Sequence, residues 1–302
     1  MNSDLLLGRL LHALAWIPGR LPLAVQRRLG AAAGGWLHAR NTREAKVARR
    51  NLELISPQLS TPERESRVEE ILRATGSNAM ETLRVWTRSR ASNLALIRRV
   101  HDQQLLLDAL ARGRGVIIAA PHYGNWELLI EYLASLAPFS LVYRVPEKPA
   151  GDAFLRLARG GANVHLVAAE TNAMRPLWRA LKAGEVVGIT PDQQPKFGAG
   201  QFAPFFGKLA LTLSLIPKLA ERSGAPVLFA FAEPVPGGFE IHFQTAAPNI
   251  ASTDLVEATT AMNQQVEQIA RRDLRQYQWT YKRYTLRPPG SGESNPYDPD
   301  CY

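Results

Sequence analysis

Apolar residues recur at helical spacing through the first third of the chain. This periodicity predicts helices over three segments, 3–17, 22–40 and 42–55. A fourth helix is expected after Ser60, because Ser60 and Glu63 have the spacing of a capping box, and it extends to Trp86. No segment of this part has the pattern of a strand, so residues 1–110 are predicted to form a helical N-terminal region.

The pattern changes at Gly115, where short apolar runs begin to alternate with helical segments. The expected strands are Val116–Ala120, Leu141–Val145, Val164–Val167, Val186–Thr190, Val227–Phe231 and Phe239–Phe243. The expected helices are 125–136, 150–160, 171–182, 211–223 and about 253–273. This alternation predicts an α/β core over residues 111–288, with a mainly parallel sheet flanked by helices. Residues 289–302 are rich in Pro, Gly, Ser and Asp and are expected to be a disordered tail.

Composition limits the class of protein. With 302 residues and 46% hydrophobic residues, the chain can bury a full core. Its one cysteine, Cys301, excludes a disulfide framework and a CxxC metal site, so no metal is expected and a reducing compartment is the default.

The positive charge is concentrated at the N-terminus. The net charge is +9, and residues 1–50 carry nine Lys or Arg residues against Asp4 and Glu44, which leaves +7 in this segment. A basic amphipathic helix is typical of a membrane surface. Arg9 and Pro18 interrupt the apolar run, which is therefore too short to span a bilayer. A signal peptide fits poorly, because Asp4 precedes the apolar run and no A-x-A site follows it cleanly. We expect peripheral or shallowly inserted membrane association, although such a helix could also pack on its own domain.

Two histidines are followed five residues later by a carboxylate. His165 and Glu170 match this spacing as well as His122 and Glu127 do. His165 is expected inside a strand, where a histidine usually has only a structural role. His122 follows the most apolar strand and precedes a strong helix, and ligands of open α/β sheets bind at this edge. His122 and Glu127 are therefore the predicted catalytic pair.

An alcohol is a poor nucleophile until its proton is removed. An imidazole, with an ordinary pKa of ~6.5, can accept that proton at neutral pH. Glu127, in the first turn of the next helix, is expected to reach back and orient the His122 ring, as the acid of a serine-hydrolase triad does. The chain contains no GxSxG, P-loop, GxGxxG or HExxH motif, so the corresponding chemistries have no support.

The segment HYGNWE resembles the HX4D/E block of the lysophospholipid acyltransferase superfamily. Further segments resemble its branch of lipid A late acyltransferases, the lauroyl and myristoyl transferases, over roughly residues 10–288. These segments are VARRNLELISPQLS, LVYRVPEKP, ITPDQQP, FAPFFGKLALT and RQYQWTYKRYTLRP. The resemblance implies a glycerol-phosphate acyltransferase-like fold and His122 and Glu127 as the catalytic pair. It also implies acyl carrier protein as the donor, a lipid A precursor as the acceptor, and a place at the cytoplasmic face of the inner membrane. No cofactor is expected.

Other residues are predicted to bind substrate. Asn125 can cap the helix beside His122, and Arg144 follows a strand on the same sheet edge, where a guanidinium could bind phosphate or could instead pair with Glu147 or Asp152. The remaining predicted substrate-binding residues are Asp192, Gln193, Phe206, Gly207 and Thr212. Asp192 and Gln193 could hold a sugar hydroxyl, shape the His122 pocket, or only form a turn. Phe202, Phe205, Phe206 and Gly207 suit an acyl-chain cleft, although core packing explains them equally well.

Three alternatives remain open. The chain could be an acyltransferase of the same fold that uses acyl-coenzyme A and another glycolipid or phospholipid. It could bind nucleic acid, because it has a pI of about 9.9 and a strip of basic and aromatic residues from Tyr277 to Tyr284. It has no nucleic-acid-binding motif, however, and no such partner is expected. It could also be an inactive scaffold, against which His122 and Glu127 argue.

Overall fold

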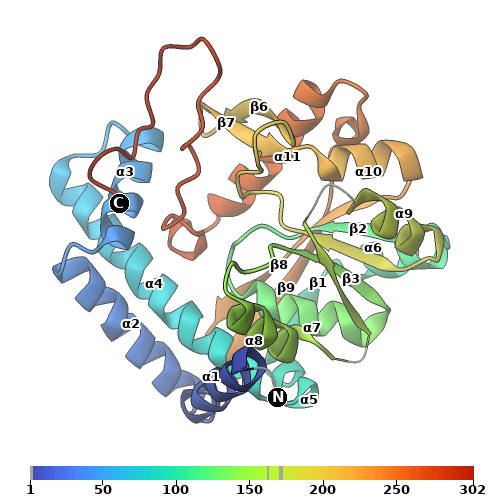
Figure 1. Ribbon diagram of the computed structural model, residues 1–302, viewed down its shortest axis with the longest axis horizontal. Helices are drawn as coiled ribbons and strands as arrows, with labels where there is room; N and C mark the ends of the chain where they lie inside the picture. The colour runs from blue at the N-terminus through green and yellow to red at the C-terminus, as the bar shows by residue number, and fades with distance from the viewer. Residues whose placement is uncertain (1–2, 162, 170–172) are drawn as a thin grey trace.

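A seven-stranded sheet crosses the centre of the molecule (Figure 1). The computed structural model describes residues 3–161, 163–169 and 173–302. The strand order is β1-β9-β8-β2-β5-β3-β4, and neighbouring strands are parallel except β8 and β9. The strands are β1 (Ile97–His101), β2 (Val116–Ala119), β3 (Phe139–Tyr143), β4 (Val164–Ala168), β5 (Val186–Ile189), β8 (Val227–Val235) and β9 (Gly238–Thr245). The predicted α/β fold with a mainly parallel sheet is confirmed.

Helices cover both faces of this sheet because its central strands are apolar on both sides. Val116 and Ile118 of β2 pack with α6 (Gln103–Ala111) and α7 (Trp126–Leu136). Ile117 and Ala119 point to the other face, in the core that includes residues of α9 (Met174–Lys182), α10 (Leu215–Ser223) and α11 (Leu255–Ala270). This two-sided burial is why β2 appears in the sequence as a continuous apolar run.

The N-terminal region is largely helical, as its periodicity predicts. Its helices are α1 (Ser3–Gly19), α2 (Leu23–Ala39), α3 (Arg43–Ile55), α4 (Thr61–Thr87) and α5 (Arg90–Leu94). The expected capping box begins α4, with Ser60 and Glu63 each accepting from the other's backbone N–H. α2 and α4 cross so closely that a Cβ on Gly30 would lie 2.3 Å from the Gly76 oxygen. Glycine at this position therefore permits the crossing.

Two features of the sheet differ from the prediction. The expectation that no strand precedes residue 110 is wrong, since β1 is a parallel edge strand of the main sheet. Its sequence, IRRVH, does not have the apolar pattern of a strand, because both arginines are exposed to solvent at the edge of the sheet. The second feature is an antiparallel hairpin of β6 (Gly200–Phe205) and β7 (Lys208–Leu213), part of which lies in the expected helix 211–223.

The C-terminal residues, for which the sequence predicts disorder, pack against the helical region. Tyr297 is 1% exposed and Cys301 is buried. The Tyr297 hydroxyl donates to Asn51 Oδ1 of α3 over 2.6 Å and accepts from the Tyr284 N–H. The predicted disorder is therefore wrong. The buried side chains of Tyr297 and Cys301 hold in place a segment that is otherwise made of turn residues.

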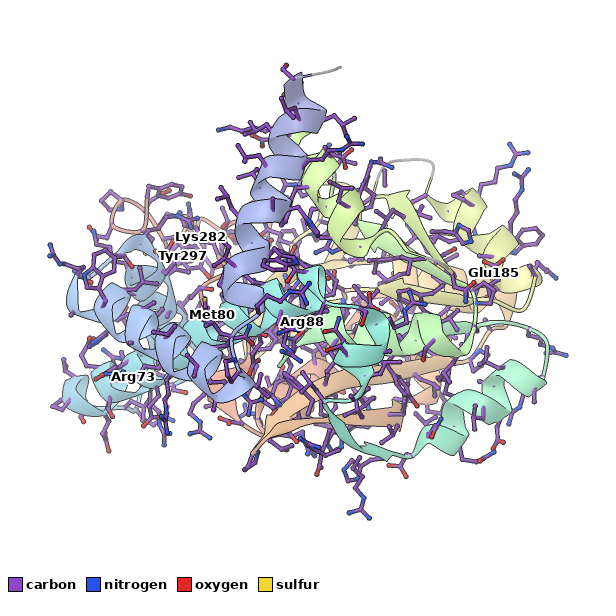
Figure 2. All side chains as sticks on the ribbon, turned by 90° about the horizontal axis from the view of Figure 1, so that it is seen from below. Arg73, Met80, Arg88, Glu185, Lys282 and Tyr297 are labelled. Carbon is purple, nitrogen blue, oxygen red and sulfur yellow. The ribbon has the colours of Figure 1, made fainter. Side chains whose placement is uncertain are left out.

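The N-terminal helix α1 projects from the rest of the molecule (Figure 2). Its inner side contacts α8 (Pro149–Arg159) and α4, and Gly8 approaches Ala153 closely. Within the described residues, no helix combines the length and the apolar character needed to cross a membrane.

We predict that Tyr297→Phe lowers the free energy of unfolding by about 1–3 kcal/mol, because Asn51 Oδ1 would remain buried without its donor. Urea denaturation measures the change. Tyr302→Phe is the matched control, since the Tyr302 ring is 68% exposed and its loss of a hydroxyl should change little. Equal effects of the two substitutions would contradict the prediction.

Candidate active site

The segment that carries His122 lies at the carboxyl end of the sheet. β2 ends at Ala119, the chain turns through residues 120–125, and α7 begins at Trp126. β5 lies beside β2 and is parallel to it, so the residues that follow Ile189 reach the same edge. This adjacency brings Asp192 next to His122 although 70 positions separate them in the chain.

The backbone of this turn is fixed on several sides. Gly124 adopts φ +60°, and a Cβ there would lie 2.1 Å from the Ala232 oxygen, so only glycine fits. The Gly124 N–H donates to the Gln276 oxygen, and Asn78 of α4 donates to the Gly124 oxygen. The turn therefore holds its histidine in place without a ligand.

Asp192 binds His122 at two points. One carboxylate oxygen accepts from the His122 backbone N–H at 2.7 Å, and the other lies 2.8 Å from Nδ1 of the ring. The Asp192 side chain is 2% exposed and that of His122 is 11% exposed. The carboxylate thus fixes both the position and the rotation of the imidazole.

This contact determines which ring nitrogen can act as a base. A carboxylate accepts a hydrogen bond, so Nδ1 carries the proton that it donates to Asp192. Nε2 is then the unprotonated nitrogen, and the side-chain amide of Gln193 donates to it at 3.2 Å. Gln193 also donates to the Gln278 amide oxygen, while the Gln278 N–H donates to the His122 carbonyl. The Nε2 lone pair, which accepts from Gln193, is therefore directed away from Asp192.

The electrostatics of the pair keep Asp192 ionised. Burial alone would raise the pKa of Asp192, but the charge that His122 carries when its ring is protonated and the hydrogen bonds from its ring and backbone outweigh burial and lower that pKa. Burial, with the nearby charge of Asp192, raises the pKa of Tyr277 well above its ordinary value. The site therefore contains a carboxylate beside the imidazole and a neutral phenol near them.

Glu127 does not hold the imidazole, which corrects the expected orientation role. Its carboxylate accepts from Nε and Nη2 of Arg159, at the end of α8, at distances of 2.6–3.1 Å. Both side chains are nearly buried. The Arg159 guanidinium also lies over the Trp126 ring, 4.6 Å from its centroid. A buried carboxylate binds the forked guanidinium in preference to an imidazole whose two nitrogens already have partners.

A cavity of about 70 Å³ opens beside His122. Its lining comes from α4, the His122 turn, α7 and residues 275–278, and comprises Ala74, Thr75, Asn78, His122, Gly124, Trp126, Arg275, Gln276, Tyr277 and Gln278. The lining is mixed, with Asn78 and Arg275 as polar groups and Trp126 as an apolar wall. A hydroxyl compound can approach His122 from this side.

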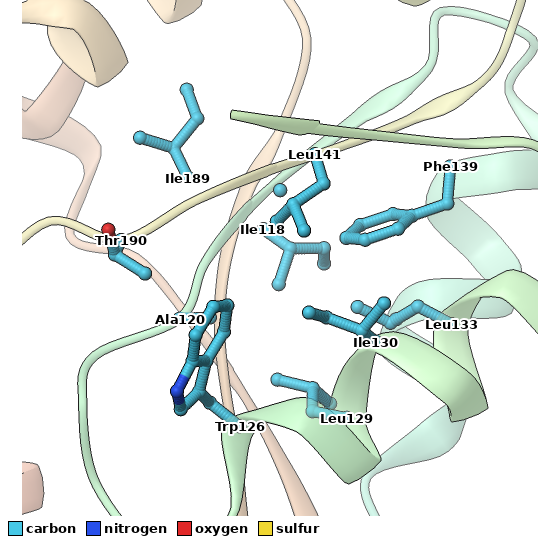
Figure 3. A pocket seen from close by; sticks show the side chains of 11 residues that line it. Ile118, Ala120, Trp126, Leu129, Ile130, Leu133, Phe139, Leu141, Ile189 and Thr190 are labelled. Carbon is cyan, nitrogen blue, oxygen red and sulfur yellow. The ribbon is translucent and has the colours of Figure 1, made fainter. Parts of the chain in front are cut away.

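A second cavity lies between α7 and the sheet (Figure 3). Trp126 lines both cavities, and the far end of the second is closed by Phe139, whose ring packs against Gly188. Its volume of about 10 Å³ is too small for an acyl chain.

The family model for bacterial lipid A biosynthesis acyltransferases matches residues 7–285. The chain belongs to this family. Among its relatives, the lipid A biosynthesis lauroyltransferase of Escherichia coli K12 is 29% identical over 278 residues, which cover 91% of this chain and 90% of the relative. The palmitoleoyltransferase of the same organism has the same identity and coverage, and a lipid A biosynthesis acyltransferase of Haemophilus influenzae is 27% identical over 89% of this chain and 86% of its own. The protein is therefore an acyltransferase.

The structure of this acyltransferase separates the predicted substrate-binding residues into two groups. Asp192 and Gln193 lie at His122, and Asn125 is the buried N-cap of α7, where its side chain accepts from the Leu128 N–H. Arg144 follows β3 and is exposed; within the described parts of the chain it has no ion pair. Asp152, one of its expected partners, pairs instead with Arg156.

The other group belongs to the β6–β7 hairpin. Phe206 and Gly207 form its turn, and the Phe206 ring packs on Trp279. Thr212 is fully buried and accepts hydrogen bonds from Asn263 and Arg283. These are the contacts of a packed core, so a role of these three residues in binding substrate stays a prediction.

The second histidine–carboxylate pair is only partly described. His165 is exposed on β4, the edge strand, where it lies opposite Ser140. Glu170 lies outside the described residues. The expected basic aromatic strip is also not a surface feature, because Tyr277, Trp279, Arg283 and Tyr284 are buried.

Sequence reasoning missed Arg159, Asn78 and Gln278 as site residues. Arg159 is the last residue of α8, and nothing in its local pattern distinguishes it from the other arginines. The signal for Asp192 was present, since it follows the predicted strand Val186–Thr190 and therefore lies at the carboxyl edge of the sheet. The spacing of five residues favoured Glu127 instead.

We predict that Asp192→Asn lowers the kcat of acyl transfer by ~10²–10⁴-fold with little change in KM, because the imidazole loses both its orientation and the charge that stabilises its protonated form. Steady-state kinetics at saturating substrate measures this effect.

Glu127→Gln is the matched comparison. It leaves Arg159 buried without its counter-charge and should lower the free energy of unfolding by about 3–5 kcal/mol, with a smaller loss of kcat in the protein that stays folded. If Asp192→Asn retains full activity while folded Glu127→Gln has none, Glu127 is the residue that orients His122.

Proposed function

We propose that this acyltransferase moves a fatty acyl chain from an acyl carrier protein thioester to a hydroxyl of a lipid A precursor, with His122 as general base. The observation that supports the proposal is the pair of hydrogen bonds that His122 donates to Asp192, because they leave Nε2 unprotonated. In this proposal the acceptor hydroxyl is itself the nucleophile and attacks the thioester directly.

The first half of the reaction starts at Nε2 of His122. The acceptor hydroxyl takes the place of the Gln193 amide and gives its proton to Nε2 as its oxygen attacks the thioester carbonyl. The imidazole becomes positively charged, and the buried carboxylate of Asp192 stabilises that charge. Asp192 stays ionised throughout, in keeping with its lowered pKa.

The second half returns the proton. The tetrahedral intermediate collapses, the carbon–sulfur bond breaks, and the departing thiolate takes the proton from Nε2. The products are the ester and the free thiol of the carrier, and His122 is neutral again. The displaced Gln193 amide lies beside the reacting atoms and can donate to the developing oxyanion.

Positive groups around the site support an anionic lipid as acceptor. Arg144 is exposed after β3 on the same sheet edge as His122, whereas Arg275 lines the cavity with its guanidinium bound to Asp273. Guanidinium groups bind phosphate through paired hydrogen bonds. Arg144 acts on phosphate of the acceptor or of the carrier's phosphopantetheine arm in this proposal. Acyl-coenzyme A also carries phosphates, so it is the alternative donor.

The outer surface of α1 supports peripheral association with the cytoplasmic face of the inner membrane. Its exposed apolar side chains are Leu5, Leu6, Leu7, Leu10, Leu11, Leu14, Trp16 and Ile17. Exposed apolar groups of this extent mark interaction surfaces. Arg9 and Arg20 are exposed in and next to α1, and Arg28 is exposed on α2. Arg27 is bound to Glu81 and to two carbonyls and is not available to lipid. A membrane-bound acceptor would then lie near the site without leaving the bilayer.

In the test, the purified protein is incubated with a lipid A precursor and either acyl carrier protein thioester or acyl-coenzyme A. Mass spectrometry then measures the mass of the lipid product. We expect a gain of one acyl mass with the carrier protein donor and none with His122→Ala. His165→Ala is the matched control and should keep its activity, because this histidine is exposed on an edge strand.

Each assignment can fail separately in this assay. Acylation from coenzyme A but not from the carrier protein would refute the donor, and acylation of a phospholipid but not of the lipid A precursor would refute the acceptor. Full activity of folded His122→Ala would refute the general base.

For α1, we predict that replacing Leu10 and Leu14 by Glu lowers binding to anionic vesicles at least ~10-fold, since burying each leucine contributes ~1.5–3 kcal/mol. Vesicle co-sedimentation measures the bound fraction. Leu107→Glu, at an exposed leucine of α6, is the control. A similar loss in the control, or none in the α1 variant, would show that α1 is not the membrane surface.

A further inference from the structure

Two histidines and a glutamate meet where β1 joins the sheet. His101 of β1 lies directly opposite His242 of β9, and Glu240 precedes His242 by two positions, so all three side chains project from the same face. One ring nitrogen from each histidine and one oxygen of Glu240 lie within 4.8 Å of one another. All three residues are half-buried.

The contacts within this group do not satisfy its polar atoms. His101 Nε2 lies 2.7 Å from Glu240 Oε2, and the two imidazole rings stack with 4.2 Å between their centroids. His242 Nε2 is buried and lacks a hydrogen-bond partner, although Glu233 Oε2 is 3.3 Å away. A buried ring nitrogen without a well-aligned partner is costly, and it points to a ligand that is not part of the chain.

We propose that His101, Glu240 and His242 bind one zinc ion. Two imidazoles and one carboxylate are a common protein ligand set for Zn²⁺, with water in the fourth position. The expected bonds of ~2.0–2.2 Å require the ligand atoms to approach a common centre. Binding therefore requires the two imidazole rings to rotate out of their parallel stack, so that a lone pair of each ring points at the ion. Zinc replaces the proton between His101 and Glu240.

The surroundings of the cluster suit a metal ligand set. Glu233 lies beside His242, and it is itself fixed by hydrogen bonds from Tyr123 and Arg272. The negative charge of Glu233 beside the cluster favours a bound cation. Phe231 stacks on His242 at 4.9 Å and limits access of water from that side.

The ion would connect an edge strand to its neighbour. β1 is the strand through which the helical N-terminal region enters the sheet, and it pairs only with β9 in the described structure. A bond from His101 through zinc to His242 and Glu240 holds β1 in register. A metal could not be expected from the sequence, because the three ligands come from strands 139 positions apart and match no short motif.

The test uses the untagged full-length protein, freed of metal by chelation and titrated with Zn²⁺. Bound zinc is measured by elemental analysis after gel filtration and by competition with a chromogenic chelator. We expect one zinc per chain and a higher Tm that saturates at one equivalent. His101→Ala, His242→Ala and Glu240→Gln should each weaken binding at least ~100-fold, since even residues outside the ligand set contribute ~10–100-fold.

Two control variants distinguish this cluster from other histidines. His38→Ala removes a histidine that contacts one carboxylate, Glu65, and His122→Ala removes the ring of the proposed base. Both should bind zinc as the unaltered protein does. Cobalt in place of zinc should give visible absorption bands that disappear in the cluster variants.

The proposal fails if the unaltered protein retains no zinc, if the cluster variants bind it equally well, or if only His122→Ala loses it. Each variant is first shown to unfold cooperatively without metal. Should His242→Ala not fold, His101→Gln and Glu240→Gln decide the question, because both positions are 29% exposed and tolerate an amide.

Discussion

The two hydrogen bonds that His122 donates to Asp192 are the interaction on which the rest of the site depends. One oxygen binds the backbone and the other binds the ring, so the imidazole is placed and its tautomer is set by a single buried carboxylate. Such a carboxylate is costly to bury unless it is paired, and this pairing requires β5 to lie beside β2. The order of the parallel strands therefore determines the chemistry that the turn after β2 can perform.

A second constraint keeps the turn rigid. Gly124 alone allows the close approach to Ala232, and α4 reaches the same turn through Asn78. The helical N-terminal region thus carries α1 and also supports the His122 turn directly, through Asn78. A site held by several elements needs little reorganisation when substrate binds, which is the main electrostatic advantage of an enzyme over water.

The sequence allowed prediction of those parts in which local pattern and tertiary environment agree. The apolar run of β2 and the capping box of α4 belong to this class, and so does His122 at a strand end. β1 was missed because edge strands tolerate arginines, and Tyr297 because one buried aromatic residue does not outweigh a disordered composition. Glu127 was assigned the wrong partner because sequence spacing does not reveal that Arg159, 32 positions away, folds against it.

The central claim is that His122 and Asp192 act as one unit in acyl transfer. A double-mutant cycle tests it most directly, with turnover of His122→Ala, Asp192→Ala and the double variant compared with the unaltered enzyme. Single-turnover conditions with excess enzyme are used, so that the slow acyl transfer by the variants can be distinguished from the uncatalysed reaction. The account predicts that the double variant is no slower than His122→Ala, because Asp192 acts only through the imidazole. Losses that multiply, so that Asp192→Ala slows the His122→Ala enzyme as much as it slows the unaltered one, would contradict it.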